Sequence, residues 1–347
     1  MSSGDYTVTY REQIEIFKTD FSRFWLGILF LLMAVFPFLA DTYFIYLANM
    51  TGIFAIGALG LNILTGAGGQ ISLGHAGFVA IGAYASGILV TKAGLPFIVA
   101  LPLSGLIASF FGFIIGLPAL RLKGLYLAMI TMGFVFVIEY LILEFPFLTG
   151  GGEGLSVPPI EIGPLVIDTD MDYYFLTMPI LVILCYFTKN ILRTPFGRAL
   201  ISIRDRDIAA EVTGVYLAKY KVQAFMLSAF FAGISGSIYG HYMSLISPDY
   251  FGFALSIDFV VIIIIGGLGT VLGTIFGSIF ITVVPEMLRL FGDLTRHTFP
   301  IFAERFGDLR EGIFGLLMIL FIVFEPTGLA GIWRRVKIYW KSWPYRY

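Results

Sequence analysis

A series of long apolar segments, separated by short polar stretches, limits the possible folds more than any other feature of this chain. A membrane-spanning helix needs about 20 mostly apolar residues, and about ten segments fit that length. Only 13% of the 347 residues are charged, against about 25% in a typical soluble domain. The sequence therefore predicts an all-α, polytopic membrane helix bundle of about ten transmembrane helices. The predicted spans are residues 24–40, 44–65, 71–90, 96–117, 125–145, 174–191, 222–242, 257–270, 271–290 and 312–324.

Charge position predicts how these spans are oriented, because Lys and Arg concentrate on the cytoplasmic side of a membrane protein. Basic residues cluster before the first span, after the fourth, between the sixth and seventh, and after the last. Ten spans place all four clusters on one face. The loop at 146–173 instead carries five acidic residues and no Lys or Arg. We therefore expect that loop outside, with a cytoplasmic N-terminal segment at 1–23, a permease domain at 24–325 and a basic cytoplasmic tail at 326–347.

Glycines at four-residue spacing are a second feature of the predicted spans. Small residues so spaced allow membrane helices to approach closely. We therefore expect helix packing at these positions. They are Gly236 and Gly240 in one span, and Gly269, Gly273 and Gly277 in another.

The stretch 62–78 mixes polar residues and glycines within and between two apolar spans. Irregular backbone at membrane depth is tolerated only where protein buries it or where it lines a watery cavity. The segment therefore either contributes to a solute path or forms a tight cytoplasmic turn whose polar groups bond to neighbouring helices. A glutamate near the outer end of the fifth span either lines a vestibule or snorkels to the surface. The path candidates are Asn62, Gln70, Ser72, His75 and Glu139.

Residues 193–215, between the sixth and seventh spans, are too polar to cross a bilayer but are patterned as a helix. Leu200, Ile203, Ile208 and Val212 fall near helical spacing and predict one apolar face. Acidic and basic residues are mixed on the remainder, which favours docking against another protein over lying on a membrane surface. The residues expected to couple to that protein are Arg198, Ile203, Arg204, Asp205, Arg206, Glu211 and Gly214.

Four motifs occur in order: GGQISLGHAGFVAIGAY at 68–84, LPALRLKGLYLAMITMGF at 117–134, TGGGEGL at 149–155 and FGRALISIRDRDIAAEVTGV at 196–215. With them, the chain resembles LivM-type permease subunits of branched-chain amino acid ABC importers, in a wider group that also serves urea and related solutes. The resemblance covers about residues 45–330. It implies a multi-pass protein of the bacterial cytoplasmic (inner) membrane that translocates Leu, Ile, Val or similar small solutes by alternating access.

The resemblance also implies the partners. Residues 196–214 would contain the coupling helix that docks in a cytoplasmic ATPase. The other subunits would be a second, LivH-like permease, two LivG/LivF-like ATPases, and a periplasmic or surface solute-binding protein. The chain itself has no GxxxxGK[ST] phosphate loop, so ATP and Mg are expected in the partner subunits. We expect no cofactor or metal in this chain, no nucleic-acid partner and no enzymatic activity of its own.

Two alternatives remain open, and a third is disfavoured. A urea or amide ABC permease would share the same motifs, and a secondary transporter not driven by an ATPase would suit the same number of spans. The GxSG at 233–236 matches that of intramembrane serine proteases. His241, however, lies six residues beyond Ser235, about 9 Å along a helix axis, which is too far for direct proton transfer.

Overall fold

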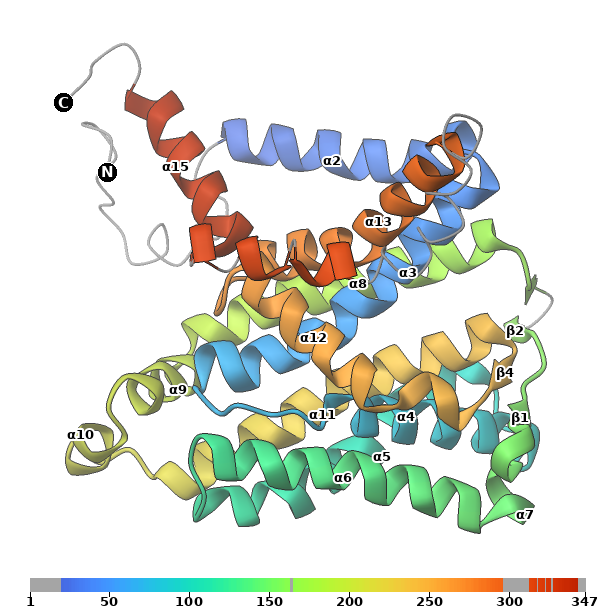
Figure 1. Cartoon of the computed structure of the whole chain (residues 1–347), viewed down its shortest axis with the longest axis horizontal. Helices are drawn as coiled ribbons and strands as arrows, with labels where there is room; N and C mark the ends of the chain where they lie inside the picture. Colours follow the sequence, from blue (N-terminus) through green and yellow to red (C-terminus); the bar gives the residue numbers. More distant parts are fainter. Residues whose placement is uncertain are drawn as a thin grey trace.

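The structure, a computed structural model, describes residues 20–162, 165–295, 312–316, 318–321, 323–325 and 327–342. Most of the predicted N-terminal segment, at 1–19, and the end of the predicted tail, at 343–347, therefore lie outside the described residues. The chain is mainly helical (Figure 1). The long helices are α2 (Asp20–Leu39), α3 (Thr42–Leu61), α4 (His75–Thr91), α5 (Phe97–Gly116), α6 (Leu125–Glu144), α8 (Asp170–Arg193), α11 (Leu217–Met243), α12 (Phe253–Gly266), α13 (Val271–Thr295) and α15 (Gly328–Ser342).

Short elements connect these helices. The π-helix η1 (Asn62–Ala67) continues α3, and α9 (Pro195–Asp205) and α10 (Asp207–Val212) lie between α8 and α11. The remaining short helices are η2 (Pro118–Leu120), α7 (Pro146–Thr149), η3 (Gly151–Glu153) and η4 (Pro248–Phe251).

Within the described parts of the chain, seven helical segments are long and apolar enough to cross a membrane. They are Thr42–Ala67, Phe97–Gly116, Leu125–Glu144, Asp170–Arg193, Leu217–Met243, Pro248–Gly266 and Val271–Leu290. Shorter apolar helices cover Phe24–Leu39, His75–Thr91 and Gly312–Phe321. Large apolar side chains such as Leu31, Phe110 and Ile183 are exposed on the outer helices, where lipid rather than water would surround them. The chain is therefore a polytopic helical membrane protein.

Helix α11 lies at the centre of the bundle and packs against α3, α4 and α5. Glycines allow the close approach of α11 to α4: a Cβ added at Gly236 would lie 1.9 Å from the Val79 carbonyl oxygen, and one at Gly240 would lie 3.3 Å from Ala83 Cβ. Because packing in lipid depends on such close contacts, these glycines hold the centre of the bundle together.

Helices α12 and α13 form a second close pair. A Cβ added at Gly277 would lie 2.0 Å from the Ile262 carbonyl oxygen, and one at Gly273 would lie 2.5 Å from the Gly266 carbonyl oxygen. Gly269 differs from the other predicted packing glycines. It lies in the turn between α12 and α13, with a φ of 78°, so it is not part of a helical repeat.

Two predicted helix boundaries were wrong. The span expected from residue 71 begins only at His75, because residues 68–74 return into the bundle without forming a helix (Figure 1). The helix expected over 193–215 is instead two helices. Arg206 between them has extended backbone, with φ −157° and ψ 99°, which redirects the chain.

The two polar loops lie at opposite ends of the bundle (Figure 1). At one end, β1 (Leu155–Ser156) pairs antiparallel with β4 (Leu245–Ile246), and β2 (Ile160–Ile162) pairs antiparallel with β3 (Leu165–Ile167). We name this the strand end. The opposite end carries α9 and α10, and we name it the α9–α10 end. The acidic and the basic loops are thus separated by the full length of the helices.

Candidate functional site

Helix α9 is held on the bundle by its apolar face. Pro195 begins the helix, because its restricted φ suits the first helical position. Leu200 and Ile203 are buried, and α9 packs against α8, η1 and α11. Ile203, one of the predicted coupling residues, therefore attaches α9 to its own chain rather than to another protein.

Helix α10 buries Ala210 but turns its large apolar side chains away from the bundle. Ile208 is 74% exposed and Val212 is 84% exposed, although helical spacing predicted one face shared with Leu200 and Ile203. That prediction was wrong because the extended Arg206 separates the two helices. The segment ends at Gly214, whose φ of 90° lies in the left-handed region that terminates many helices. An exposed apolar surface on a polar loop is typical of a docking surface.

Arg204 connects α9 to the irregular part of the bundle. Its Nη1 donates a hydrogen bond of 2.8 Å to the carbonyl oxygen of Gly66, in the π-helix η1. Its aliphatic stem lies against Gly69, where an added Cβ would be 2.6 Å from Arg204 Cγ. Gly69 also has a φ of 66°, in the left-handed region. A side chain at position 69 would therefore strain the backbone as well as clash with Arg204. α9 and η1 are therefore in direct contact.

Asn62 continues this connection to the second glycine-rich segment. Its Nδ2 donates to the Thr270 carbonyl oxygen at 3.0 Å and to Thr274 Oγ1 at 2.9 Å. Its Oδ1 accepts a hydrogen bond of 2.7 Å from the backbone N–H of Gly269. All three hydrogen bonds are buried or part-buried, which makes them important for stability. We name the set Arg204, Gly66, Asn62, Gly269, Thr270 and Thr274 the clasp.

Helix α10 has its own, weaker link to the bundle. The Lys123 ammonium group, in the loop after η2, forms a salt bridge with the Asp207 carboxylate at the start of α10. The hydrogen bond from Lys123 holds the pKa of that carboxyl group below its usual value. The Lys123 side chain is 66% exposed, so solvent screens the pair. α10 is therefore attached less firmly than α9.

The other predicted coupling residues lie on the surface of the α9–α10 end. Arg198 Nη1 donates to the Arg193 carbonyl oxygen at 3.1 Å, and Asp205 pairs with Arg204 at 3.2 Å. Arg206 and Glu211 are exposed. The surface of the α9–α10 end therefore carries both signs of charge.

The remaining path candidates lie in different places. His75 Nε2 donates to the Gly57 carbonyl oxygen at 2.8 Å, and Ser72 Oγ accepts from the Gly74 N–H at 3.3 Å. Gln70 is only 5% exposed, yet neither polar atom of its side chain has a hydrogen-bond partner. Glu139 is half-buried on α6 and lies apart from these residues in the chain. The structure thus brings Asn62 into the clasp. Among the path candidates it leaves the Gln70 amide and His75 Nδ1 buried without a hydrogen-bond partner in the described part of the chain.

The segment that carries these residues is held by side chains of neighbouring helices. The backbone N–H of Leu73 donates to Thr131 Oγ1 at 2.9 Å, and that of Ala76 donates to Ser256 Oγ at 3.0 Å. Thr131 belongs to α6 and Ser256 to α12. Non-helical backbone inside the bundle is therefore stable here because protein groups replace the missing helical bonds.

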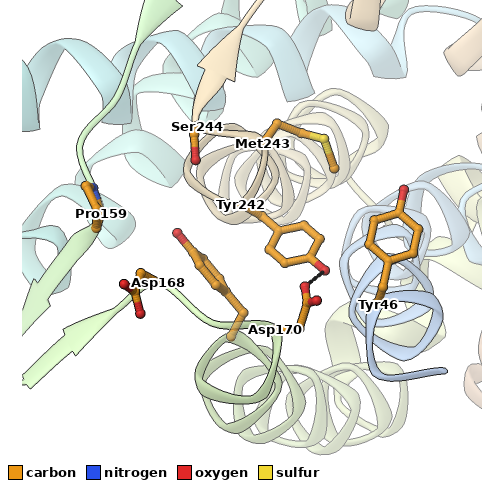
Figure 2. A pocket seen from close by; sticks show the side chains of 8 residues that line it. Tyr46, Pro159, Asp168, Asp170, Tyr242, Met243 and Ser244 are labelled. Atoms are coloured by element: carbon orange, nitrogen blue, oxygen red, sulfur yellow. Dashed lines mark hydrogen bonds between the residues drawn. The ribbon is translucent and has the colours of Figure 1, made fainter. Parts of the chain in front are cut away.

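A cavity of about 280 Å³ opens at the strand end, and sequence reasoning did not find it (Figure 2). The Tyr242 hydroxyl donates to Asp170 Oδ1, and the Tyr242 ring lies 4.9 Å from that of Tyr173 and 6.0 Å from that of Tyr46, measured between centroids. Aromatic faces and carboxylate oxygens together attract ammonium groups. The lining residues are Tyr46, Pro159, Asp168, Asp170, Tyr173, Tyr242, Met243 and Ser244.

The structure does not bring together the groups of a serine protease. Ser235 is fully buried, and its hydroxyl donates to the Ile53 carbonyl oxygen at 2.7 Å. His241 Nδ1 instead lies 3.0 Å from the Ser237 carbonyl oxygen. The GxSG serine therefore joins α11 to α3. In the part of the chain that the structure describes, no three His, Cys, Asp or Glu residues gather to hold a metal ion.

Sequence reasoning missed the partners of the clasp and the whole tyrosine cavity. Arg204 and Gly66 are 138 residues apart, and Asn62 and Thr270 are 208 apart, so no local spacing indicates either contact. The acidic residues Asp168 and Asp170, at the start of α8, were noted for their charge alone. The sequence offered one hint of the contact between the two glycine-rich segments. Each segment carries a polar residue, Asn62 in the first and Thr270 in the second.

A helical bundle with non-helical, polar segments at its centre and a projecting helix pair at one end is typical of a membrane transport permease. A profile of the family described as "Branched-chain amino acid transport system / permease component" matches residues 43–322. Because this match covers most of the chain, the protein belongs to that family of permeases.

Individual relatives agree with this assignment. The high-affinity branched-chain amino acid transport system permease proteins LivM of Escherichia coli K12 and Salmonella typhimurium are 32% and 31% identical over 336 residues, covering 90% of this chain and 76% of each relative. The probable branched-chain amino acid transport permease protein LivM of Methanocaldococcus jannaschii is 24% identical over 233 residues, covering 65% of this chain and 66% of that protein. No solved structure matches the chain significantly.

Proposed function

We propose that this permease is one of two membrane-spanning subunits of an ATP-driven importer for leucine, isoleucine and valine, and that α10 receives the movement of an ATPase. The observation that carries the proposal is the contrast within one loop. Ile208 and Val212 on α10 are exposed, whereas Arg204 on α9 bonds to the centre of the bundle. A surface for an external protein is thus only a few residues from a contact with the interior.

The proposed orientation puts the α9–α10 end in the cytoplasm. The seven long apolar segments and the three shorter ones would together make ten spans, with both termini on the cytoplasmic side. Basic residues such as Arg198 and Lys219 lie at the α9–α10 end, and the acidic loop lies at the strand end. This distribution supports the orientation because basic loops remain in the cytoplasm.

In the proposed cycle, nucleotide-driven closure of two partner ATPases moves α10, and α9 moves with it. Arg204 passes the movement to η1, and Asn62 passes it to the turn between α12 and α13. The bundle then alternates between outward-facing and inward-facing states. The partners would be a second, LivH-like permease, two LivG/LivF-like ATPases that bind ATP and Mg, and a solute-binding protein that delivers the amino acid.

The solute would enter this chain at the strand end. The carboxylates and tyrosine rings of the cavity suit the ammonium group of an amino acid, and Gln70 offers unpaired polar atoms near the other end. Each of these two places offers the solute only a few polar or aromatic groups. Weak contacts of this kind suit a subunit that must release its solute as readily as it accepts it.

The test is uptake of radiolabelled leucine into proteoliposomes that contain the assembled importer. We expect the double variant Ile208→Asp/Val212→Asp, and Asp205→Lys or Glu211→Lys, to insert normally but to lose at least tenfold of ATP-dependent uptake. Lys219→Gln, an exposed change outside α10, is the matched control and should transport normally.

Two outcomes would contradict the proposal and would each identify an alternative function. Leucine uptake by this chain alone, in vesicles without an ATPase, would identify a secondary transporter. ATP hydrolysis stimulated by a binding protein loaded with urea, and not by one loaded with leucine, would identify a urea or amide permease.

A further inference from the structure

Two hydrogen bonds join α8 and α11 at the strand end. The Tyr242 hydroxyl, on α11, donates to Asp170 Oδ1 at the start of α8 (Figure 2). In the other direction, the Tyr173 hydroxyl, on α8, donates to the His241 carbonyl oxygen at 2.9 Å. The carboxylate of Asp170, which lines the cavity at the strand end, is thus bonded to the neutral hydroxyl of Tyr242.

Beside this junction, one buried acceptor lacks a donor. Asn49, on α3, is fully buried, and its Nδ2 donates to the Asp170 carbonyl oxygen at 2.8 Å. No group in the described part of the chain donates to Asn49 Oδ1, although the Asn49 amide lies beside the Tyr242 hydroxyl. That hydroxyl has a single proton, which already goes to Asp170. Because an unpartnered buried acceptor is costly, the junction favours the arrival of one more donor.

The lining of the cavity indicates which kind of donor fits. None of the eight described lining residues is a Lys or an Arg, and Asp168 adds a second carboxylate. The Tyr242 ring lies between those of Tyr173 and Tyr46, at 4.9 and 6.0 Å between centroids. Aromatic faces attract cations, and carboxylates form their strongest hydrogen bonds with charged donors. The missing donor is therefore a positively charged one.

We propose that the α-ammonium group of the imported amino acid displaces the Tyr242 hydroxyl from Asp170 and so loosens the end of α11 from α8. The inference rests on the proposed entry of the solute at the strand end. An ammonium group carries a full positive charge, so its attraction to the carboxylate exceeds that of a hydroxyl. The displaced hydroxyl has Asn49 Oδ1 beside it as an acceptor. Of the two bonds between the helices, only the one from Tyr173 then remains.

The proposal can be tested by protection of a cysteine in the full chain, held in lipid nanodiscs without ATP or partner subunits. The substitution Ser244→Cys, at an exposed lining residue, is made in a Cys185→Ala background and labelled with a water-soluble maleimide. Leucine should slow the labelling. So should 3-methylbutylamine, which keeps the ammonium group and lacks the carboxylate. In contrast, 4-methylpentanoate keeps the carbon skeleton and the carboxylate but lacks the ammonium group, and it should not protect.

Two further variants measure the competition. Tyr242→Phe keeps the ring and removes the competing hydroxyl, so leucine should protect at about tenfold lower concentration, the ratio that one hydrogen bond provides. Asp170→Asn removes the negative charge and should raise the protecting concentration by about tenfold or more. Glu161→Gln removes an exposed carboxylate from the same loop, outside the cavity, and is the matched control that should change nothing.

Weaker protection in Tyr242→Phe would overturn the proposal, because the hydroxyl would then hold the solute rather than compete with it. Equal protection by 4-methylpentanoate, or no protection by any of the three compounds, would overturn it as well. The outcome is separate from that of the importer proposal because the labelling needs no ATP. Protection without ATP-dependent uptake would contradict the importer alone, and uptake without protection would contradict the displacement alone.

Discussion

Helix α9 turns Leu200 and Ile203 into the bundle, whereas α10, which one residue separates from α9, turns Ile208 and Val212 outward. Leu200 in α9 is fully buried, and Ile208 in α10 is 74% exposed. The only change in backbone between them is the extended conformation of Arg206. A single break thus divides one amphipathic pattern into a surface that packs on this chain and a surface that is exposed. The comparison teaches that large aliphatic residues stabilise the fold in α9, whereas in α10 they form the exposed surface that we propose binds a partner.

The largest expected difference between the two helices is in stability. Leu200→Ala removes a buried side chain and should lower the free energy of unfolding by about 3 kcal/mol, within the usual range for a buried leucine. Ile208→Ala should change it by less than about 0.5 kcal/mol because the side chain is already exposed. Thermal unfolding of both variants in the same detergent measures the difference. Equal losses would show that α10 also packs on the bundle.

Arg204→Ala should have the next largest effect. The Gly66 carbonyl oxygen then loses its charged donor, and we expect a loss of about 1–3 kcal/mol in stability together with weaker coupling of ATP hydrolysis to uptake. Lys219→Ala, which removes an exposed cation at the same end of the molecule and outside the predicted coupling residues, is the matched control. If importers assembled with each variant hydrolyse ATP and take up leucine normally, the clasp does not carry the movement of α9.

Gly69→Ala should weaken the same contact by a different route. A methyl group at a φ of 66° is disfavoured by about 1 kcal/mol, and it would also press on the Arg204 stem. We expect a loss of about 1–2 kcal/mol, read as a lower midpoint of unfolding. Gly214→Ala has a similar φ without neighbouring atoms, so it separates backbone strain from the contact with Arg204.

Asp207→Asn should have the smallest effect. Its exposed salt bridge with Lys123 contributes less than about 1 kcal/mol. Because the folded protein lowers the pKa of Asp207, that stability is present above the carboxyl group's unfolded pKa. It is lost as pH falls through the folded pKa. Unfolding midpoints of wild type and Asp207→Asn should therefore differ at pH 7 and converge in acid, and a constant difference would contradict the assignment.

Several features could be predicted because they depend on neighbours in the sequence. The apolar runs predicted the helical membrane class, and the charge run at 193–215 predicted a polar segment too hydrophilic to cross. The ion pair of Glu286 and Arg289, three residues apart on α13, also follows from spacing. The start of α4 could not be predicted, because the bonds that permit non-helical backbone before His75 come from Thr131 and Ser256 in other helices.

Apolar length and charge determined by themselves that this chain forms membrane helices, because crossing hydrocarbon imposes the same local requirement wherever a segment lies. Tertiary structure alone decided that Arg204 meets Gly66, that Asn62 meets the turn at Thr270, and that Ile208 faces away from the bundle. The physical reason is that a hydrogen bond depends on distance in space. Segments far apart in the sequence come within that distance only after the helices have packed.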